Sequence, residues 1–245
     1  MNTYRADLHV HTVVSPCADV EMIPPLIVAE AVQQGIDIIA ITDHNSSANV
    51  SAVQKAAKGF PLLVIPGMEV QTLEDIHVLC LFATLDQLLD WQAIVSQHLP
   101  AIKNNAEFFG EQFIVDETGD FLASEDQMLL TAASLSFEEA YHAVTSLGGF
   151  FIPAHVNRKA NGLLTTLGFV PADTPLELLE ISRHLTPEMA KQNFPQIKDY
   201  LLIQNGDVHY LADMLGSLHL KMAAPSFNEL ILALKNQKGR SFYIS

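Results

Sequence analysis

Strand-length apolar runs alternate with longer helical segments along most of the chain. Runs rich in Ile, Leu and Val predict strands buried on both faces, and segments that begin with proline or end at glycine predict helices. Strands are expected at, or ending at, residues 7–9, 37–42, 62–65, 77–83, 150–154, 177–181 and 200–204. Helices are expected at residues 23–34, 50–58, 85–99, 137–147, 158–167, 188–193 and 227–236. This alternation predicts a parallel α/β sheet with right-handed crossovers, either open or closed into a barrel.

Residues 104–133 break the alternation. Within them, residues 111–115 and 121–123 flank Asp-Glu-Thr-Gly-Asp, a pattern that predicts a β-hairpin with glycine in its turn. We expect one domain over residues 1–245 that carries this hairpin as an insertion. The insertion could cover the mouth of a site and limit substrate size, contact a second copy, or have no function of its own.

The composition is that of a folded, globular protein. Hydrophobic residues make up 49% of the chain and charged residues 17%, a balance that excludes a disordered chain or a coiled coil. The apolar runs are too short to cross a bilayer, and the first residues lack the apolar core of a secretory signal. Because Cys17 and Cys80 are the only cysteines, no disulfide framework is expected. We therefore expect a reduced, cytoplasmic protein.

The charge balance restricts the partners. Asp and Glu number 28 and Lys and Arg 13, so the net charge is −15 with histidine neutral. A protein that binds long nucleic acid non-specifically needs clustered Lys and Arg, and here the Lys and Arg residues are scattered along the chain. Acidic residues around bound cations would weaken this argument. We expect a small phosphorylated substrate, no membrane and no long nucleic acid, with a short oligonucleotide left open.

Histidine and carboxylate side chains recur where the predicted strands begin or end. In a parallel barrel, catalytic groups lie at the carboxyl ends of the strands, and residues two apart in an extended chain, such as His9 and His11, point the same way. The segments are Asp7-Leu8-His9-Val10-His11, Thr42-Asp43-His44-Asn45, Gly67-Met68-Glu69, His77, Pro153-Ala154-His155 and Gly206-Asp207-Val208-His209. The isolated histidines are interpreted as surface or structural residues: His98, His142, His184 and His219.

The recurring side chains predict a metal centre. Burying imidazoles and carboxylates together without a cation would leave like charges and unpaired polar groups in a low dielectric. The candidate ligands are His9, His11, Cys17, His44, Glu69, His77, His155, Asp207 and His209. Because a tetrahedral catalytic zinc needs about three protein ligands, this set predicts two or three divalent ions of zinc, iron or manganese, with Glu69 as a natural bridge.

Five segments form an ordered and specific set of motifs: Asp-Leu-His-Val-His-Thr, Thr-Asp-His-Asn, Gly-Met-Glu-Val, Pro-Ala-His-Val and Gly-Asp-Val-His. The set resembles the motifs of the PHP (polymerase and histidinol phosphatase) family, and the resemblance covers most of the chain outside residues 104–133. It implies a distorted (β/α)7 barrel that holds up to three metals, commonly zinc, iron or manganese. It also implies phosphoester cleavage, which most characterised single-domain members perform.

The resemblance further implies how the ligands divide. One ion would be held by His9, His11, Glu69 and Asp207, a second by Glu69, His77 and His155, and a third by His44, His209 and the residue at position 17. Several members have histidine where this chain has Cys17. We favour a thiolate ligand there, because thiolate binds zinc and iron; the alternative is a buried small hydrophobe beside a weak third ion. Cys80, inside a strand, is expected in the core.

Charged side chains next to the candidate ligands are assigned supporting roles. Asp7 and Asp43 adjoin ligand histidines, so we interpret them as carboxylates that orient metal-bound imidazoles; Asp43 could instead contact a metal or transfer protons as a catalytic residue. Arg158 and Arg183 come shortly after predicted strands, and guanidinium groups bind phosphate through two donors. We expect both to bind the substrate phosphate, with Lys159 in support; each would otherwise be an ordinary surface cation.

We hypothesise a metal-dependent phosphoesterase that cleaves a small phosphate ester through a metal-bridged hydroxide at a multinuclear site. The same chemistry could hydrolyse a C–N bond, as in amidohydrolases. A non-catalytic, metal-stabilised domain is the third hypothesis, and it predicts unfolding on metal loss without any turnover. The sequence does not specify the substrate, the metal, the occupancy of the third site, the oligomeric state or the role of the insertion.

Overall fold

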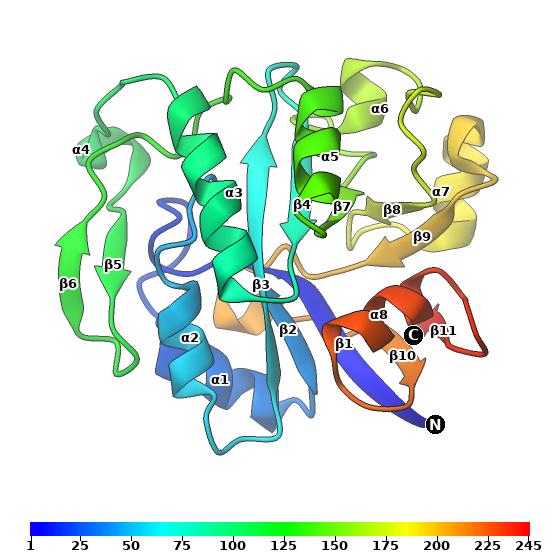
Figure 1. Ribbon diagram of the computed structural model, residues 1–245, viewed down its shortest axis with the longest axis horizontal. Helices are drawn as coiled ribbons and strands as arrows, with labels where there is room; N and C mark the ends of the chain where they lie inside the picture. The colour runs from blue at the N-terminus through cyan, green and yellow to red at the C-terminus, as the bar shows by residue number, and fades with distance from the viewer.

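A curled, mixed sheet forms the centre of the computed structural model, which describes residues 1–245 (Figure 1). Across the sheet the strands are β11 (Ser241–Ile244), β10 (Leu218–Met222), β1 (Asn2–Val10), β2 (Ile38–Ile41), β3 (Leu63–Gln71), β4 (His77–Leu81) and β7 (Phe150–Pro153). β1, β2 and β3 are parallel, whereas β4 is antiparallel to both of its neighbours. The expected all-parallel sheet is therefore wrong at β4, because the short connection over residues 72–76 can join only antiparallel strands.

Two further strands close the sheet into a barrel. β8 (Leu178–Ile181) and β9 (Leu201–Gln204) pair in parallel. The Val156 amide, after β7, donates to the Glu180 carbonyl of β8 with an N–O distance of 2.9 Å. The His11 amide donates to the Val208 carbonyl at 3.0 Å, which joins the segment after β9 to the end of β1. The barrel thus contains β1, β2, β3, β4, β7, β8 and β9, and the expected distorted (β/α)7 class is confirmed.

Helices follow most of the barrel strands. They are α1 (Pro24–Gln33), α2 (Val50–Ala56), α3 (Leu85–His98), α4 (Ala106–Phe109), α5 (Phe137–Ser146), α6 (Leu163–Thr166), α7 (Pro187–Asn193) and α8 (Phe227–Leu234), with 3-10 turns at Pro195–Ile197 and Leu211–Asp213. Capping boxes at Thr84 and Ser136 begin α3 and α5. The helix expected at 158–167 is shorter in the structure and consists of α6 alone. The residues before it form a turn, in which the Arg158 amide donates a hydrogen bond to the His155 carbonyl. The sequence pattern did not predict α4, β10 or β11.

Both faces of the central strands are buried, as continuous apolar runs predict. Ile39 and Ile41 of β2 pack in the larger core, which the helices cover, whereas Ile38 and Ala40 point into the barrel interior. α8 contributes to that interior core. Cys80 is fully buried in the larger core, as expected. No helix has the length and apolar character needed to cross a bilayer.

The insertion forms the expected hairpin, with β5 (Phe113–Val115) antiparallel to β6 (Phe121–Ser124), at the edge of the molecule (Figure 1). The Phe113 amide donates to the Val13 carbonyl at 3.0 Å. The Asn49 side chain donates to the Phe113 carbonyl at 2.9 Å and accepts from the Val115 amide at 3.0 Å. The insertion is therefore hydrogen-bonded to the loop that follows β1 rather than attached only at its ends.

Candidate metal centre

The side chains of His9 and His11 are fully buried at the end of β1, where they converge on two carboxylates. His9 Nε2 lies 3.3 Å from both Glu69 Oε1 and Asp207 Oδ1. His11 Nε2 lies 3.4 Å from Glu69 Oε2 and 3.6 Å from Asp207 Oδ1. Both Nε2 atoms and Glu69 Oε2 have no hydrogen-bond partner. Because buried unpaired polar atoms are costly, this arrangement fits a cation held between the four side chains.

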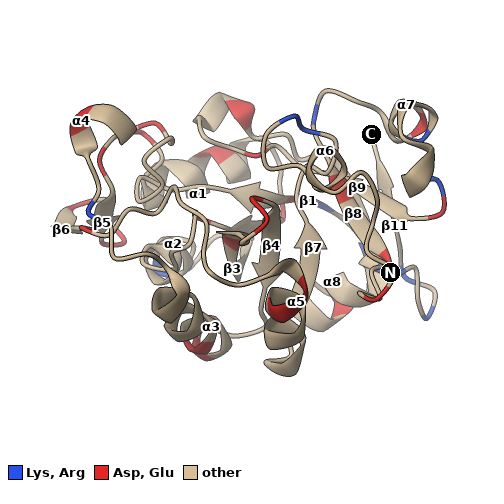
Figure 2. Ribbon diagram, turned by 90° about the horizontal axis from the view of Figure 1, so that it is seen from above, with Lys and Arg blue, Asp and Glu red and all other residues tan.

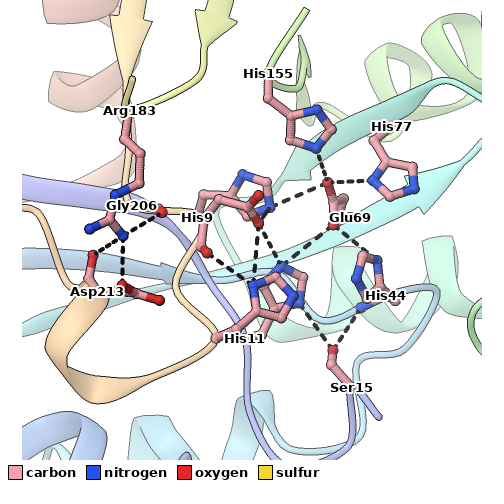
Figure 3. Close-up of polar contacts among 12 residues, drawn as sticks. His9, His11, Ser15, His44, Glu69, His77, His155, Arg183, Gly206 and Asp213 are labelled. Atoms are coloured by element: carbon pink, nitrogen blue, oxygen red, sulfur yellow. Dashed lines mark hydrogen bonds and ion pairs between the residues drawn. The ribbon is translucent and has the colours of Figure 1, made fainter. Parts of the chain in front are cut away.

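Glu69 lies at the middle of the centre (Figure 3). Its Oε1 is 2.9 Å from His77 Nδ1 and 3.1 Å from His155 Nε2, and its Oε2 is 3.0 Å from His44 Nδ1. Burial raises the pKa of the Glu69 carboxyl, but the imidazoles of His77, His9 and His44 outweigh burial and hold this pKa well below its usual range. Glu69 is therefore an ionised carboxylate in contact with several candidate ligands, as a bridging role requires.

The candidate ligand atoms form three overlapping groups, each within 4.8 Å. The groups are His9, His11, Glu69 and Asp207; His44, Glu69 and His77; and His11, His44 and His209. The first is the set expected for one ion. In the second, His44 takes the place expected for His155, which contacts Glu69 from outside the group. The structure thus brings the expected histidines and carboxylates together, and their roles as ligands stay predictions.

Cys17 is exposed beside the third group. Desolvation raises the pKa of its thiol, but hydrogen bonds with the His209 and His44 imidazoles outweigh desolvation and lower this pKa from 9.0 to about 6. The alternative of a buried small hydrophobe is therefore wrong, because the residue is exposed and its thiol faces two imidazoles. The sulfur lies outside the closely spaced groups, so ligation by Cys17 stays a prediction.

In three imidazoles, one ring nitrogen contacts an oxygen atom outside the metal centre. The pairs are His9 Nδ1 with Glu180 Oε2 at 3.1 Å, His11 Nδ1 with Ser15 Oγ at 3.0 Å, and His209 Nδ1 with the Asp207 carbonyl at 2.9 Å. Carboxylate and carbonyl oxygens only accept, so Nδ1 of His9 and of His209 carries the proton in these contacts. This tautomer leaves the Nε2 lone pair available for a metal.

Asp43 is fully buried and accepts three hydrogen bonds. They come from the Thr12 amide at 2.6 Å, the Thr12 hydroxyl at 2.8 Å and the Ser15 hydroxyl at 2.7 Å. Because the Ser15 proton points to Asp43, the Ser15 oxygen can accept from His11 Nδ1. Asp43 therefore reaches an imidazole through Ser15 rather than directly, and a catalytic role for it stays a prediction.

Asp7 does not orient an imidazole, so its expected role is wrong. Its carboxylate accepts from the backbone amides of Gly206 at 3.1 Å and Leu215 at 2.9 Å. The Asp7 side chain thus contacts the backbone of the chain after β9 instead of the His9 ring. Burial raises the pKa of the Asp7 carboxyl to about 6 despite these amide donors. Asp7 thus anchors the loop that carries Asp207.

Glu180 is a functional candidate that the sequence interpretation missed. It lies almost fully buried near the carboxyl end of β8. Its carboxylate contacts the His9 ring and accepts from the His155 backbone amide at 2.8 Å. The available signal was a single carboxylate in the apolar run Leu-Leu-Glu-Ile, at the end of a strand where the other candidates also lie.

A cleft of about 370 Å³ opens beside the centre. Its lining includes His155, Arg158, Glu180, Arg183, His184 and Asp207. Arg158 Nη1 is 2.5 Å from Asp207 Oδ2, and Arg183 Nη1 is 3.0 Å from Asp213 Oδ1. Both arginines therefore line the cleft beside the centre, and phosphate binding by them stays a prediction. Lys159 is exposed outside this lining, whereas His184, to which the sequence assigned no role, belongs to it.

Comparison with known families identifies the chain. The model of the PHP domain matches residues 7–156. The chain belongs to the PHP domain family. A curated relative, the 5'-3' exoribonuclease Rnm of Salmonella typhimurium, is 36% identical over 73 residues, which are 29% of this chain and 24% of that protein. This PHP domain therefore matches about a quarter of that relative's length.

Two solved structures share the fold of this PHP domain. The lesion-specific endonuclease PfuEndoQ from Pyrococcus furiosus has a TM-score of 0.77 at 19% identity, over 98% of this chain and 58% of that one. An amidohydrolase from Chromobacterium violaceum has a TM-score of 0.57 at 16% identity, over 86% and 90% of the two chains. At these identities the likeness establishes the barrel fold.

The matched range of the PHP domain contains most of the candidate ligands. His9, His11, Cys17, His44, Glu69, His77 and His155 lie within residues 7–156, whereas Asp207 and His209 lie beyond them. The loop after β9 brings the last two to the centre through the contact with β1. The family assignment supports the expected enzyme class, a metal-dependent phosphoesterase.

Proposed function

We propose that this PHP domain is a metal-dependent phosphoesterase that hydrolyses a small phosphate ester at a centre of two or three divalent ions. The observation that carries the proposal is that buried, unpartnered imidazole and carboxylate atoms converge beside a cleft lined by two arginines. In this proposal residues 1–245 form one metallohydrolase domain, with an insertion at about residues 104–133.

The donor set fits zinc, iron or manganese, because it combines imidazole with carboxylate. One ion would bind His9, His11, Glu69 and Asp207; a second would bind Glu69, His77 and His155; and a third would bind His44, His209 and Cys17. Divalent ions held there would lower the pKa of a bound water and would offset the charge on the phosphoryl oxygens.

The protein side chains hold and orient these groups. Burial raises the pKa of the Asp207 carboxyl, but the His9 and His11 imidazoles outweigh burial and keep this pKa well below its usual range, so the carboxylate is ionised. Arg158 contacts the outer oxygen of Asp207 while its side chain remains 46% exposed, so other guanidinium donors can reach a substrate. Arg183, on the same cleft, supplies a second cation for the phosphoryl oxygens.

Two features favour phosphoester cleavage over the other hypotheses. Guanidinium groups in the cleft suit a phosphate, whereas an amide carbonyl has no charge for them to neutralise. A purely structural metal site is closed on all sides, whereas the Asp207 and His209 side chains remain 22% and 19% exposed. The centre therefore has an open side on which a reacting group can bind.

A small ester suits the cleft and the charge of the chain. The cleft holds about 370 Å³, and in Figure 2 the Lys and Arg segments are few and separated, without a continuous track for a polymer backbone. A short oligonucleotide is the second candidate. It is favoured by the similarity to an exoribonuclease and by the shared fold with Endonuclease Q, which was solved with a 27-mer duplex carrying an abasic lesion at its active site.

The test begins with metal content per chain, measured on protein purified without chelators or a histidine tag. The protein loaded with zinc, iron or manganese is then assayed on p-nitrophenyl phosphate, histidinol phosphate, nucleoside monophosphates, short RNA and DNA oligonucleotides, and an amide and lactam panel. We expect metal-dependent phosphate release from a small ester. Cleavage of oligonucleotides alone would replace the substrate class, cleavage of amides alone would replace the reaction, and no metal binding would remove the enzyme proposal.

A further inference from the structure

Both carboxylate oxygens of Glu180 form hydrogen bonds. It is 1% exposed on β8. Its Oε2 accepts from the His155 backbone amide at 2.8 Å and lies 3.1 Å from His9 Nδ1. Its Oε1 lies 3.2 Å from the same ring nitrogen and accepts from the Asn205 side-chain amide at 2.7 Å. A single carboxylate on β8 thus contacts residues of β1 and of the segments after β7 and β9.

The contact with His9 determines which ring nitrogen faces the metal centre. Both Glu180 oxygens accept hydrogen bonds from amides, so His9 Nδ1 is the donor in its contact with this carboxylate. The Nε2 lone pair then points to Glu69 and Asp207, the carboxylates 3.3 Å away. A carboxylate behind a ligating imidazole also increases its basicity, which strengthens a bond to a cation.

The contact with His155 supports a strained backbone. His155 has a φ of +28°, a left-handed conformation that is unfavourable for a residue other than glycine. The Glu180 carboxylate accepts from the amide of this same residue. The resulting turn directs His155 Nε2 to Glu69 Oε1 at 3.1 Å. Without the carboxylate, the turn would lose the buried acceptor that holds it.

We propose that Glu180 is a positioning residue that holds both the His9 ring and the His155 backbone in place. It thereby couples the two metal sites that share Glu69. The inference rests on the proposed metal-dependent function, because His9 and His155 are assigned there to different ions. It predicts that one substitution at Glu180 weakens binding of both ions, although the side chain is assigned as a ligand to neither.

The first variant is Glu180→Gln, which keeps the size of the side chain. The introduced amide keeps one acceptor for His9 and His155 but presents a donor to the Asn205 amide. We expect the affinity for zinc, measured by competition with a chromophoric chelator, to fall about 10- to 100-fold at both sites. The double variant Glu180→Gln/Asn205→Asp restores an acceptor opposite the introduced amide, while the Leu8 amide, which donates to Asn205 Oδ1, keeps a partner. We expect it to recover most of the lost affinity.

The matched control is Gln204→Ala. This side chain donates to the Ser182 and Leu185 carbonyls within the same two-stranded region, and neither hydrogen bond involves an imidazole. We expect it to lower the melting temperature while zinc affinity remains within about threefold of that of the unmodified protein. Equal losses of affinity in Gln204→Ala and Glu180→Gln would show a general structural effect and overturn the inference.

The remaining outcomes separate the inference from the proposed function. If the unmodified chain binds zinc and Glu180→Gln binds it equally well, the positioning role is wrong and the phosphoesterase proposal stands. If the unmodified chain binds no metal, the proposed function fails first. If Glu180→Gln does not fold, ¹⁵N NMR of the zinc-loaded unmodified protein decides: we expect the His9 proton on Nδ1, and a proton on Nε2 would overturn the inference.

Discussion

The two sides of the metal centre differ in how their side chains are held. On one side, His9 and Glu69 come from strands that pair with neighbours in a continuous sheet, and both side chains are fully buried. On the other side, Asp207 and His209 come from the loop after β9, which meets β1 through one isolated bridge at Val208. Their side chains remain partly exposed.

This difference separates two tasks that a hydrolytic centre must combine. Strand ladders fix the buried ligands with little freedom to move, which preorganises a metal site. A loop held by a few hydrogen bonds, such as those that the Gly206 and Leu215 amides donate to Asp7, leaves the opposite side open to the cleft. We therefore expect substitutions on the sheet side to affect metal binding most, and substitutions on the cleft side to affect substrate binding more.

The largest effect is expected from Glu69→Gln on the sheet side. The change removes the only buried charge that contacts His44, His77 and His155 together. We expect turnover to fall on the order of 10³-fold and at least one metal equivalent to be lost, measured by steady-state assay and elemental analysis. Glu139→Gln, at the capping box of α5, serves as the control. Normal metal content and activity in Glu69→Gln would contradict the central role of Glu69.

Asp207→Asn tests the loop side of the same ion. Because the amide lacks the negative charge that Asp207 presents to the His9 and His11 imidazoles, we expect turnover to fall by about 100-fold or more. His98→Ala should leave activity unchanged, because His98 contacts the Ser134 hydroxyl at an exposed position. Equal activities of these two variants would overturn the site assignment.

Asn49→Ala tests the junction between the sheet side and the insertion. The buried Asn49 side chain links the Thr12 hydroxyl to the backbone of β5. Its loss leaves buried groups unpaired, so we expect the free energy of unfolding in urea to fall by about 2 kcal/mol. Asn228→Ala, at an exposed position, should change this free energy by less than about 0.5 kcal/mol. Matching values for the two variants would mean that the insertion is not anchored through Asn49.

The smallest effect is expected from Arg158→Ala on the cleft side. Loss of a charge-assisted contact with phosphate should raise KM about tenfold with metal content unchanged, measured by kinetics and elemental analysis. Lys159→Ala is the neighbouring control, because Lys159 is exposed outside the cleft lining. A variant that kept full substrate affinity would remove Arg158 from the phosphate site.

The candidate ligands could be found from the sequence because the rule behind them is local. A histidine or carboxylate that follows an apolar strand, as His44 and His155 do, lies at the barrel end regardless of how the strands are ordered. The roles of Asp7 and Glu180 could not be found in this way. The first depends on backbone amides 199 and 208 residues away along the chain, and the second on a contact between segments 171 residues apart.

The sequence by itself determined the alternating elements, the hairpin, the family resemblance and the residue types of the metal centre, because these depend on local pattern and side-chain chemistry. Only the tertiary structure decided that β4 is antiparallel to its neighbours and that β8 and β9 close the barrel. It also decided that His9 Nδ1 faces Glu180 while His9 Nε2 faces Glu69 and Asp207. These features depend on how distant segments pack, since one buried carboxylate or amide must find its partner wherever the fold places it.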